Sequence, residues 1–243
     1  MVVTFYQQDI IWGDAEANRQ KVEEQMAASA SGADIYVVPE TFTTGFGDHM
    51  AALAEEQEGP TLQWARRMAS RYDLLFVGTW IVKDGDHIYN RLHWVCPDGT
   101  FGHYDKAHTF RVSGEADQIA RGIQREVFEW RGWKIKPAVC YDLRFPKWLR
   151  NDNLSYDLLL VCANWPGSRH EAWTTLLKAR AIENQCYVLG CNRCGTDGAG
   201  IPYTGDSAII DYKGFVLSGT TATLDKEKLY TFREHWPFYL DFD

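Results

Sequence analysis

Residues 135–146 read IKPAVCYDLRFP, a short apolar run that ends in a cysteine and is followed at once by polar, turn-prone residues. The apolar run is typical of a buried strand, and the change in character predicts that the strand ends at Cys140. Open sheets bind ligands at the carboxyl ends of their strands, so a thiol there can meet a substrate. Free cysteines are also often buried as small hydrophobic residues, and this stretch alone leaves both roles open for Cys140.

Two charged residues elsewhere also follow strand-like runs. Residues 35–39 are continuously apolar up to a proline, as in a buried parallel strand, and Glu40 comes directly after them. Lys106 follows a predicted strand at residues 101–104. On position alone, Glu40 could instead be a surface carboxylate that caps residues 41–44. The sequence nevertheless predicts a carboxylate, an amine and a thiol at the ends of three strands.

The composition indicates a globular protein with a small-molecule ligand. A chain of 243 residues suits one large α/β domain over 1–243, and 45% hydrophobic with 24% charged residues is a globular profile. The net charge of −8 offers no basic patch to nucleic acid or to an anionic membrane. The first residues lack the pattern of a secretion signal and no window approaches a membrane span, so we expect a cytoplasmic protein.

The cysteines favour reduced thiols over a disulfide framework. The chain has six, and most lie within apolar, strand-like runs. Cys191 and Cys194 form a C-x-x-C pair, but there is no second pair and no H-x-x-x-H motif, so a zinc site or a redox pair is disfavoured. We therefore predict no metal and no organic cofactor.

The order of the predicted elements repeats within the chain. A helix, a buried strand and a hairpin occur in this order within residues 62–104 and again within residues 173–218. This repetition predicts two similar halves that pack as a four-layer α-β-β-α sandwich, with helices outside and two mixed sheets inside. The tail, residues 235–243, is rich in aromatic and apolar side chains, so we expect it to dock on the domain or on a partner subunit.

A long segment between the two halves has no regular pattern. Residues 105–122 show neither a period of 2 nor one of 3.6, and such stretches inside compact domains are usually functional. The polar residues that this segment contributes are Lys106, His108, Arg111 and Glu115.

Glu40, Lys106 and Cys140 suffice for the hydrolysis of an amide. A free thiol is mostly protonated at neutral pH, so either the lysine must favour the thiolate or the carboxylate must take the proton, and the sequence leaves both open. Attack on an amide carbonyl builds an oxyanion, which Lys106 could stabilise together with the backbone N–H of Tyr141. Glu40 could then deprotonate the water that hydrolyses the thioester.

The motifs around these residues resemble those of the nitrilase superfamily of carbon–nitrogen hydrolases, and more narrowly its omega-amidases. They read PE at residues 39–40, TTGF at 43–46, YDKAH at 104–108, VCYDLRFP at 139–146, ANWP at 163–166, ARAIENQ at 179–185 and YTGDS at 203–207. The resemblance implies the α-β-β-α sandwich, a catalytic triad of Glu40, Lys106 and Cys140, and homodimers or higher assemblies. It also implies a second glutamate, Glu115. Ala107 stands where the family commonly has a basic or polar residue.

The resemblance points to omega-amides of short dicarboxylates, such as 2-oxoglutaramate or 2-oxosuccinamate, as substrates. A buried carboxylate needs a cationic partner, and bidentate recognition favours arginine. The candidates are Arg169, Arg111 and Arg144. We rank Arg169 first because we expect Arg144 to pair with a carboxylate such as Asp142. The alternative is that all three arginines are solvated or structural. Trp165, on a turn after the strand predicted at 158–162, is the expected pocket wall.

Three alternatives remain at the level of the sequence. The activity could be that of another amidase or carbamoylase of the superfamily, because these share one triad. A catalytically silent member could serve as a binding or assembly protein. The chain could also be a cysteine–histidine hydrolase that uses His108 or His170 as its base, although no papain-type signature surrounds the cysteine.

Overall fold

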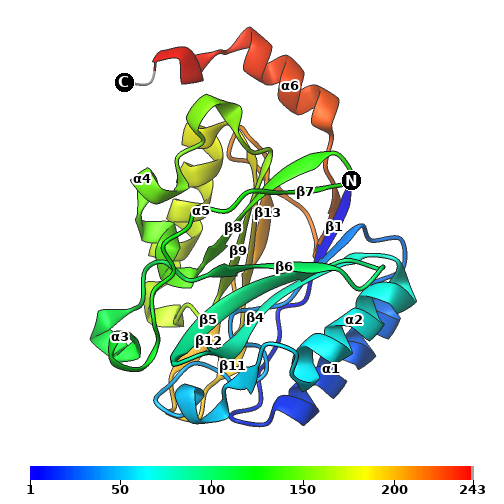
Figure 1. Ribbon diagram of the computed structural model, residues 1–243. Coiled ribbons are helices and arrows are strands. Elements are labelled where there is room, and N and C mark those ends of the chain that lie inside the picture. Colours follow the sequence, from blue (N-terminus) through cyan, green and yellow to red (C-terminus); the bar gives the residue numbers. More distant parts are fainter. Residues whose placement is uncertain (242–243) are drawn as a thin grey trace.

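Two β-sheets pack face to face at the centre of the computed structural model, which describes residues 1–241 (Figure 1). In spatial order, the first sheet consists of β15 (Thr221–Thr223), β1 (Val2–Phe5), β2 (Ile35–Val37), β4 (Leu75–Asp84), β5 (His87–Val95) and β6 (Phe101–Asp105), with β3 (Glu55–Glu56) paired to β4. The second sheet consists of β14 (Val216–Leu217), β13 (Ala208–Ile210), β10 (Tyr187–Asn192), β9 (Leu158–Ala163), β8 (Trp133–Val139) and β7 (Phe128–Trp130). A separate hairpin joins β11 (Cys194–Thr196) to β12 (Pro202–Thr204).

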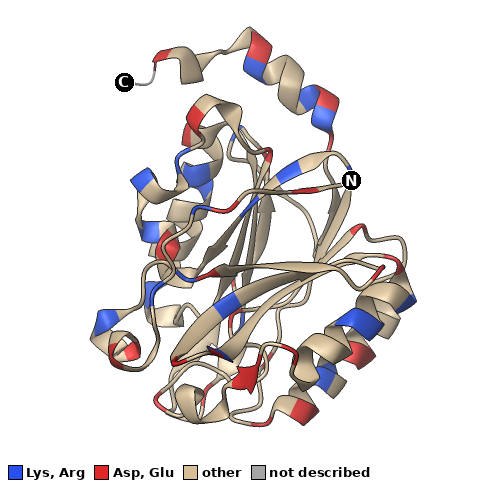
Figure 2. Cartoon of the chain, viewed as in Figure 1, with Lys and Arg blue, Asp and Glu red and all other residues tan. Residues whose placement is uncertain are grey.

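Helices cover the outer faces of both sheets (Figure 1). The helices on these faces are α1 (Ala15–Ser29) and α2 (Pro60–Tyr72) on the first sheet, and α4 (Pro146–Leu149) and α5 (His170–Asn184) on the second. α3 (Glu115–Gln118) lies in the segment after β6, and α6 (Lys226–His235) lies at one end of the molecule (Figure 1), where Leu229 packs into the core between the sheets. Apolar side chains of α1 and α2 pack on the first sheet, and those of α4 and α5 pack on the second. Figure 2 shows the charged residues gathered on the helices and loops, with few on the central strands. The four-layer α-β-β-α sandwich predicted from the sequence is confirmed.

The central strands bury both of their faces. Ile35 and Val37 of β2 face the other sheet, whereas Tyr36 and Val38 face α1 and α2. The same alternation in β9 divides its side chains between the space between the sheets and the space under α5. A strand that is covered on both faces has no polar side, which explains why these segments read as continuous apolar runs.

The two sheets share one connection order. In the first, β2 pairs parallel with β1 and β4, and β4 continues into the antiparallel β5. In the second, β9 pairs parallel with β8 and β10, and β10 pairs with the antiparallel β13. Because β6 is antiparallel to β5, it runs in the same direction as β2. The carboxyl ends of β2 and β6 therefore meet at one edge of the first sheet.

The long segment expected to be irregular contains short helical pieces. A 3₁₀ turn spans Arg111–Ser113 and is followed by α3. Gly114 separates them with a φ of 76°, a left-handed conformation that suits glycine. The sequence missed α3 because a helix of four residues is too short to show a period. Its first residue, Glu115, is buried.

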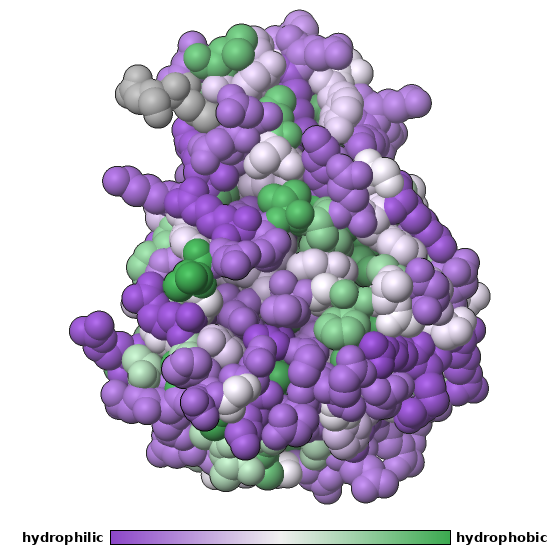
Figure 3. Space-filling view, viewed as in Figure 1, coloured by the Kyte–Doolittle hydropathy of each residue, from purple (hydrophilic) through white to green (hydrophobic). Residues whose placement is uncertain are grey.

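The C-terminal segment is only partly covered. α6 is anchored by the buried Arg233, whose Nη1 donates to Asp157 Oδ1 at 2.9 Å. Beyond it, Trp236, Phe238 and Leu240 are 48%, 51% and 69% exposed. Figure 3 shows apolar surface at the top of this face, where Figure 1 places the C-terminal segment. The prediction of a docked tail extended to Phe242, which lies outside the described residues.

The six cysteines are free thiols. Cys191 is buried and lies 3.5 Å from the carbonyl oxygen of Tyr6, while Cys194 lies 3.3 Å from that of Gln7. Within residues 1–241, no group of three or more histidine, cysteine or acidic side chains could hold a metal ion. None of the helices in this range is both long and apolar enough to cross a membrane.

Candidate active site

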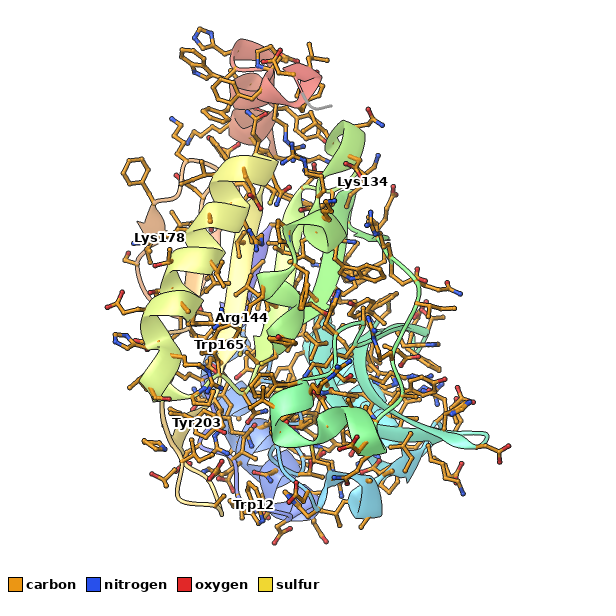
Figure 4. All side chains as sticks on the ribbon, turned by 90° about the vertical axis from the view of Figure 1, so that its left-hand side faces the viewer. Trp12, Lys134, Arg144, Trp165, Lys178 and Tyr203 are labelled. Carbon is orange, nitrogen blue, oxygen red and sulfur yellow. The ribbon has the colours of Figure 1, made fainter. Side chains whose placement is uncertain are left out.

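A cavity of about 610 Å³ opens at the edge where strands of both sheets end. Its lining includes Lys106, Cys140 and Asn164, which directly follow β6, β8 and β9. Six aromatic side chains also line it, namely Trp12, Phe46, Phe110, Tyr141, Trp165 and Tyr203. The charged side chains Asp48, Arg144, Arg169 and Asp197 line it as well. Figure 4 shows Trp165, Tyr203 and Trp12 below Arg144 on one side of the molecule. The cavity thus combines apolar walls with a few polar groups, as small-molecule sites do.

Cys140 begins a tight turn at the end of β8. Its φ is 44°, in the left-handed region, and a 3₁₀ turn spans Cys140–Arg144. A non-glycine residue in this conformation costs of order 1–3 kcal/mol and persists only where its surroundings hold it. Because of this turn, Cys140 lies just beyond the end of β8, and its side chain lines the cavity.

The buried side chain of Asp142 stabilises this turn through hydrogen bonds. Its Oδ2 accepts hydrogen bonds from the backbone N–H of Val139 at 3.0 Å and from the hydroxyl of Tyr104 at 2.8 Å. Its Oδ1 accepts one from the backbone N–H of His108 at 2.9 Å and lies 2.7 Å from His108 Nδ1. The buried carboxylate therefore ties the end of β8 to β6 and to the segment after it.

Lys106 lies between two carboxylates. Its Nζ donates to Glu40 Oε1 at 2.8 Å and to both oxygens of Glu115 at 2.9 Å, and these three side chains are fully buried. Burial lowers the pKa of Lys106, but the charges of Glu115 and Glu40 outweigh that effect and raise it above its usual range. The ring of Phe46, whose centroid is 5.1 Å from Nζ, covers the amine. Lys106 is therefore a fixed positive charge.

Glu40 connects both sheets to this cluster. Besides Lys106, its Oε1 accepts from Asn90 Nδ2 at 2.8 Å, and its Oε2 accepts from the backbone N–H of Asn164 at 2.8 Å. The side-chain amide of Asn164 donates to the backbone oxygen of Glu40 and, at 2.9 Å, to Thr41 Oγ1. These bonds leave the carboxylate no freedom to rotate, and it faces the thiol.

The surroundings of Cys140 favour its neutral thiol. Burial raises its pKa well above the ordinary value of a thiol, and the charge of Glu40 raises it further, although Lys106 acts in the opposite direction. A hydrogen bond with Glu40 adds to the effect, and Sγ also lies 3.8 Å from the carbonyl oxygen of Asn164. Of the two routes that the sequence left open, the arrangement favours proton transfer to the carboxylate.

Two asparagines belong to the site that the sequence analysis did not single out. Asn90, in the middle of β5, donates to Glu40 and, at 3.3 Å, to Glu115, and its Oδ1 accepts from Thr79 Oγ1 at 3.0 Å. Nothing in the sequence around Asn90 marks it. Asn164 carried a signal, because it follows the buried strand β9 just as Glu40 follows β2.

The predicted substrate-binding residues fall into two groups. Trp165 lines the cavity as expected, and so does Arg169, whose guanidinium lies over the ring of Phe110 at 5.4 Å. Arg111 is exposed and does not line the cavity. Its turn, Arg111–Ser113, contributes Val112 and Ser113 to the wall instead.

The expected pairing of Arg144 with Asp142 is wrong. Both oxygens of Asp142 are engaged by other donors, as described above. Arg144 lies instead with its guanidinium 4.9 Å from the ring centroid of Trp165 and lines the cavity. Closeness along the chain did not identify the partner of Arg144, because Asp142 is buried whereas Arg144 is exposed.

The remaining residues that the sequence singled out are Tyr141, His108 and His170. Tyr141 lines the cavity, and its ring packs edge-on against Phe110 and Phe145. His108 faces Asp142 and stacks on Phe145 with 3.7 Å between ring centroids. His170 is exposed at the start of α5. Neither His108 nor His170 lines the cavity, so a pair of Cys140 with either of these two histidines has no geometric support.

Comparison with known proteins agrees with this architecture. The sequence profile of the carbon-nitrogen hydrolase family matches residues 2–230. The chain is 44% identical to Omega-amidase YafV of Yersinia enterocolitica, over 99% of this chain and 96% of that protein. It is 33% identical to the 2-oxoglutaramate amidase of Bacillus subtilis, over 89% of this chain and 85% of that protein.

A solved structure is also similar over the full length. A CN-hydrolase superfamily protein of Xanthomonas campestris, described with an arsenic adduct in its active site, superposes with a TM-score of 0.97. Its sequence is 38% identical, and the match covers 100% of this chain and 97% of that one. With a profile match along almost all of the sequence and relatives this similar, the chain belongs to the carbon-nitrogen hydrolase family.

Proposed function

We propose that this protein is an omega-amidase, which hydrolyses the terminal amide of a short dicarboxylic acid monoamide to the free acid and ammonia. The observation that carries the proposal is the buried cluster in which Lys106 lies between Glu40 and Glu115 beside the thiol of Cys140. The names of the similar proteins from Yersinia enterocolitica and Bacillus subtilis support the substrate class, with 2-oxoglutaramate as the first candidate.

The first half of the proposed reaction forms a thioester. Glu40 takes the proton of the Cys140 thiol as the sulfur attacks the amide carbon, since burial and the charge of Glu40 raise the pKa of the thiol and favour its neutral form. A C–S bond forms and the carbonyl electrons move to oxygen, where Lys106 and the backbone N–H of Tyr141 stabilise the negative charge. The C–N bond then breaks, and the nitrogen takes the proton from Glu40 and leaves as ammonia.

The second half hydrolyses the thioester. Water enters in place of ammonia and gives a proton to Glu40 while its oxygen attacks the acyl carbon. The same oxyanion site stabilises the second tetrahedral intermediate. The C–S bond breaks, and the sulfur recovers its proton from Glu40. Lys106 keeps its own proton throughout, because its pKa is raised by the two carboxylates despite its burial. Glu115 acts as a positioning residue that holds the amine.

The expected cellular context belongs to the same proposal. Six free thiols suit the reducing cytoplasm. We expect one domain over 1–243 that forms a homodimer or a higher homo-oligomer, because the half-exposed apolar side chains after α6 would be covered by a partner subunit.

Ammonia release from a panel of amides tests the proposed function. The panel pairs 2-oxoglutaramate and succinamate with neutral amides of the same chain length, such as pentanamide and butanamide. We expect kcat/KM to be much higher for the amides that carry a distal carboxylate. Equal turnover of both sets would remove the omega-amidase assignment and leave a general amidase. No ammonia from any amide would contradict amide hydrolysis itself.

A further inference from the structure

We propose that Trp12 is a positioning residue of the reaction, which holds the ring of Phe46 over the amine of Lys106 and so keeps water from the charge that stabilises the oxyanion. This role rests on the proposed amide hydrolysis, in which Trp12 itself takes no direct part. Trp12 belongs to the segment between β1 and α1, is half-buried and lines the cavity. Its indole is the point where two other loops of the site meet.

Three glycines let the backbone of these loops lie directly on the indole of Trp12. A Cβ atom added at Gly47 or at Gly198 would lie 2.5 Å from the ring, and one added at Gly45 would lie 3.3 Å from it. Carbon atoms in contact are ordinarily about 3.5–4.0 Å apart, so a larger residue at Gly47 or Gly198 would displace the ring. The imidazole of His49 packs on the same indole, with 4.0 Å between ring centroids.

Phe46 lies between two of these glycines in the loop after β2. Gly45 precedes it and Gly47 follows it, so the indole of Trp12 contacts the chain on both sides of Phe46. The ring of Phe46 lines the cavity, and its centroid is 5.1 Å from Lys106 Nζ. A shift of the loop away from Trp12 would therefore carry the ring of Phe46 away from the amine.

Hydrogen bonds hold the first part of this loop independently of the indole. The backbone oxygen of Thr44 accepts from the backbone N–H of Gly13 and from His49 Nε2, both at 2.9 Å. The backbone oxygen of Thr43 accepts from Asn18 Nδ2 at 2.8 Å. The indole extends the attachment to residues 45–47. Its removal should thus loosen Phe46 while the loop stays bound to the segment that carries Trp12.

The cover over Lys106 affects catalysis because its charge acts on a transition state. The amine is fully buried, and a fixed charge stabilises an oxyanion most strongly where water is excluded. Water that reached the amine would hydrate it and weaken its attraction for the oxyanion. Because the oxyanion exists only during the chemical steps, the loss should appear mainly in kcat.

A double-mutant cycle tests whether Trp12 acts through Phe46. Trp12→Ala, Phe46→Ala and the double variant are assayed for kcat and KM on 2-oxoglutaramate. We expect Trp12→Ala to lower kcat about 10- to 100-fold, as a small misplacement near the reacting atoms does. The double variant should lose no more than Phe46→Ala alone, because both changes remove the same cover. Trp12→Phe should recover most of kcat, since it keeps a ring against the glycines.

Labelling of Lys106 provides a readout that does not depend on activity. Reductive methylation with formaldehyde and dimethylamine-borane, followed by peptide mass spectrometry, should modify Lys106 slowly in the unmutated protein and faster in Trp12→Ala and Phe46→Ala. Ile11→Ala is the matched control, because Ile11 is the neighbouring apolar residue, is 40% exposed and does not line the cavity. Its kcat and its labelling should stay as in the unmutated protein.

Three results would overturn the positioning role of Trp12. Losses that multiply in the double variant would show that Trp12 acts independently of Phe46. A rise in KM with unchanged kcat in Trp12→Ala would show a wall that touches the substrate instead. Unchanged methylation of Lys106 in Trp12→Ala would show that the cover does not depend on the indole. If the unmutated protein hydrolysed no amide, the proposed function would fail, and the methylation rates would still decide whether Trp12 holds Phe46.

Discussion

At the scale of single residues, Lys106 and Glu40 have different roles in the site. The sequence alone left open which of them activates the thiol of Cys140. Lys106 holds its proton between two carboxylates and serves as a fixed charge for the oxyanion. Glu40, held by Asn90 and Asn164, is the group that can exchange a proton with sulfur. The raised pKa of the Cys140 thiol favours this exchange, because a neutral thiol must lose its proton as it attacks.

The first prediction follows from the causes of that raised pKa. Because only the thiolate is alkylated, the rate of reaction of Cys140 with iodoacetamide should still be rising as the pH passes 9.0, the ordinary value for a thiol. Glu40→Gln removes one of the charges that raise the pKa, so it should move this profile to lower pH and accelerate alkylation near neutrality. The same substitution should lower kcat by about 10²- to 10⁴-fold.

The measurement is peptide mass spectrometry after timed alkylation between pH 6 and 10, with Cys140→Ala as the blank for the other thiols. If Glu40→Gln increases the alkylation rate of Cys140 and also loses hydrolysis, a purely structural role for Glu40 is excluded. Rapid alkylation of the unmutated enzyme at pH 7 would instead show that Lys106 maintains a thiolate, and the assigned order of proton transfers would be wrong.

At the scale of elements, the site depends on short pieces that follow strands. α3 contributes Glu115, the second carboxylate on Lys106, and Glu115 also accepts from the backbone N–H of Phe110 at 2.6 Å. This residue therefore joins the long segment after β6 to the buried amine. Its carboxylate oxygens contact Lys106, Asn90 and the backbone N–H of Phe110, so we expect Glu115 to act through Lys106 and not on the substrate.

We predict that Glu115→Gln lowers kcat about 10- to 100-fold with a much smaller change in KM, since misplacing Lys106 weakens the transition state more than substrate binding. Asp117→Asn is the matched control, because Asp117 is an exposed carboxylate on the same short helix. Steady-state kinetics with 2-oxoglutaramate provide both constants. Equal effects of the two substitutions, or a loss of activity that only follows a loss of folded protein, would contradict the positioning role.

The elements also show why prediction from the sequence succeeded for some residues and not for others. Glu40, Lys106 and Cys140 each follow a strand-like run. The strands before Glu40 and Cys140 are largely buried, so their sequences are continuously apolar, whereas β6 before Lys106 is only partly buried and was predicted from the turn signals around it. Asn90 lies inside a strand, so its role arises only from the pairing of β4 with β5. The partner of Arg144 depends on which way a turn faces, which spacing along the chain does not determine.

At the scale of the whole molecule, the exposed apolar residues after α6 are the main feature that one chain leaves uncovered. α6 itself is held by the pair of Arg233 with Asp157 and by the buried Leu229. The backbone oxygen of Trp236 accepts from Gln185 Nε2 at 2.7 Å, and its backbone N–H donates to the backbone oxygen of Phe232 at 2.9 Å. The segment is therefore attached to this subunit by its backbone while much of its apolar surface remains open.

We predict that deletion of residues 236–243 shifts the protein to a smaller species in sedimentation velocity. The melting temperature of the isolated subunit should change less, because α6 and its buried ion pair remain. Arg233→Met is the contrasting variant. It leaves Asp157 without its main buried partner, and breaking such pairs costs several kcal/mol, about 3–5 in comparable cases. Unchanged sedimentation of the truncated protein at micromolar concentration would show that this segment does not contact a second copy.

The whole account depends on Cys140 as the nucleophile, and hydrolysis of 2-oxoglutaramate by Cys140→Ala and Cys140→Ser tests it most directly. Ammonia release is measured beside circular dichroism and melting of the same preparations. Both variants should keep the fold and lose activity by several orders of magnitude, as in other hydrolases that lose their nucleophile, because a serine hydroxyl is far less acidic than a thiol. If either folded variant retained more than a tenth of the activity, Cys140 would not be the nucleophile.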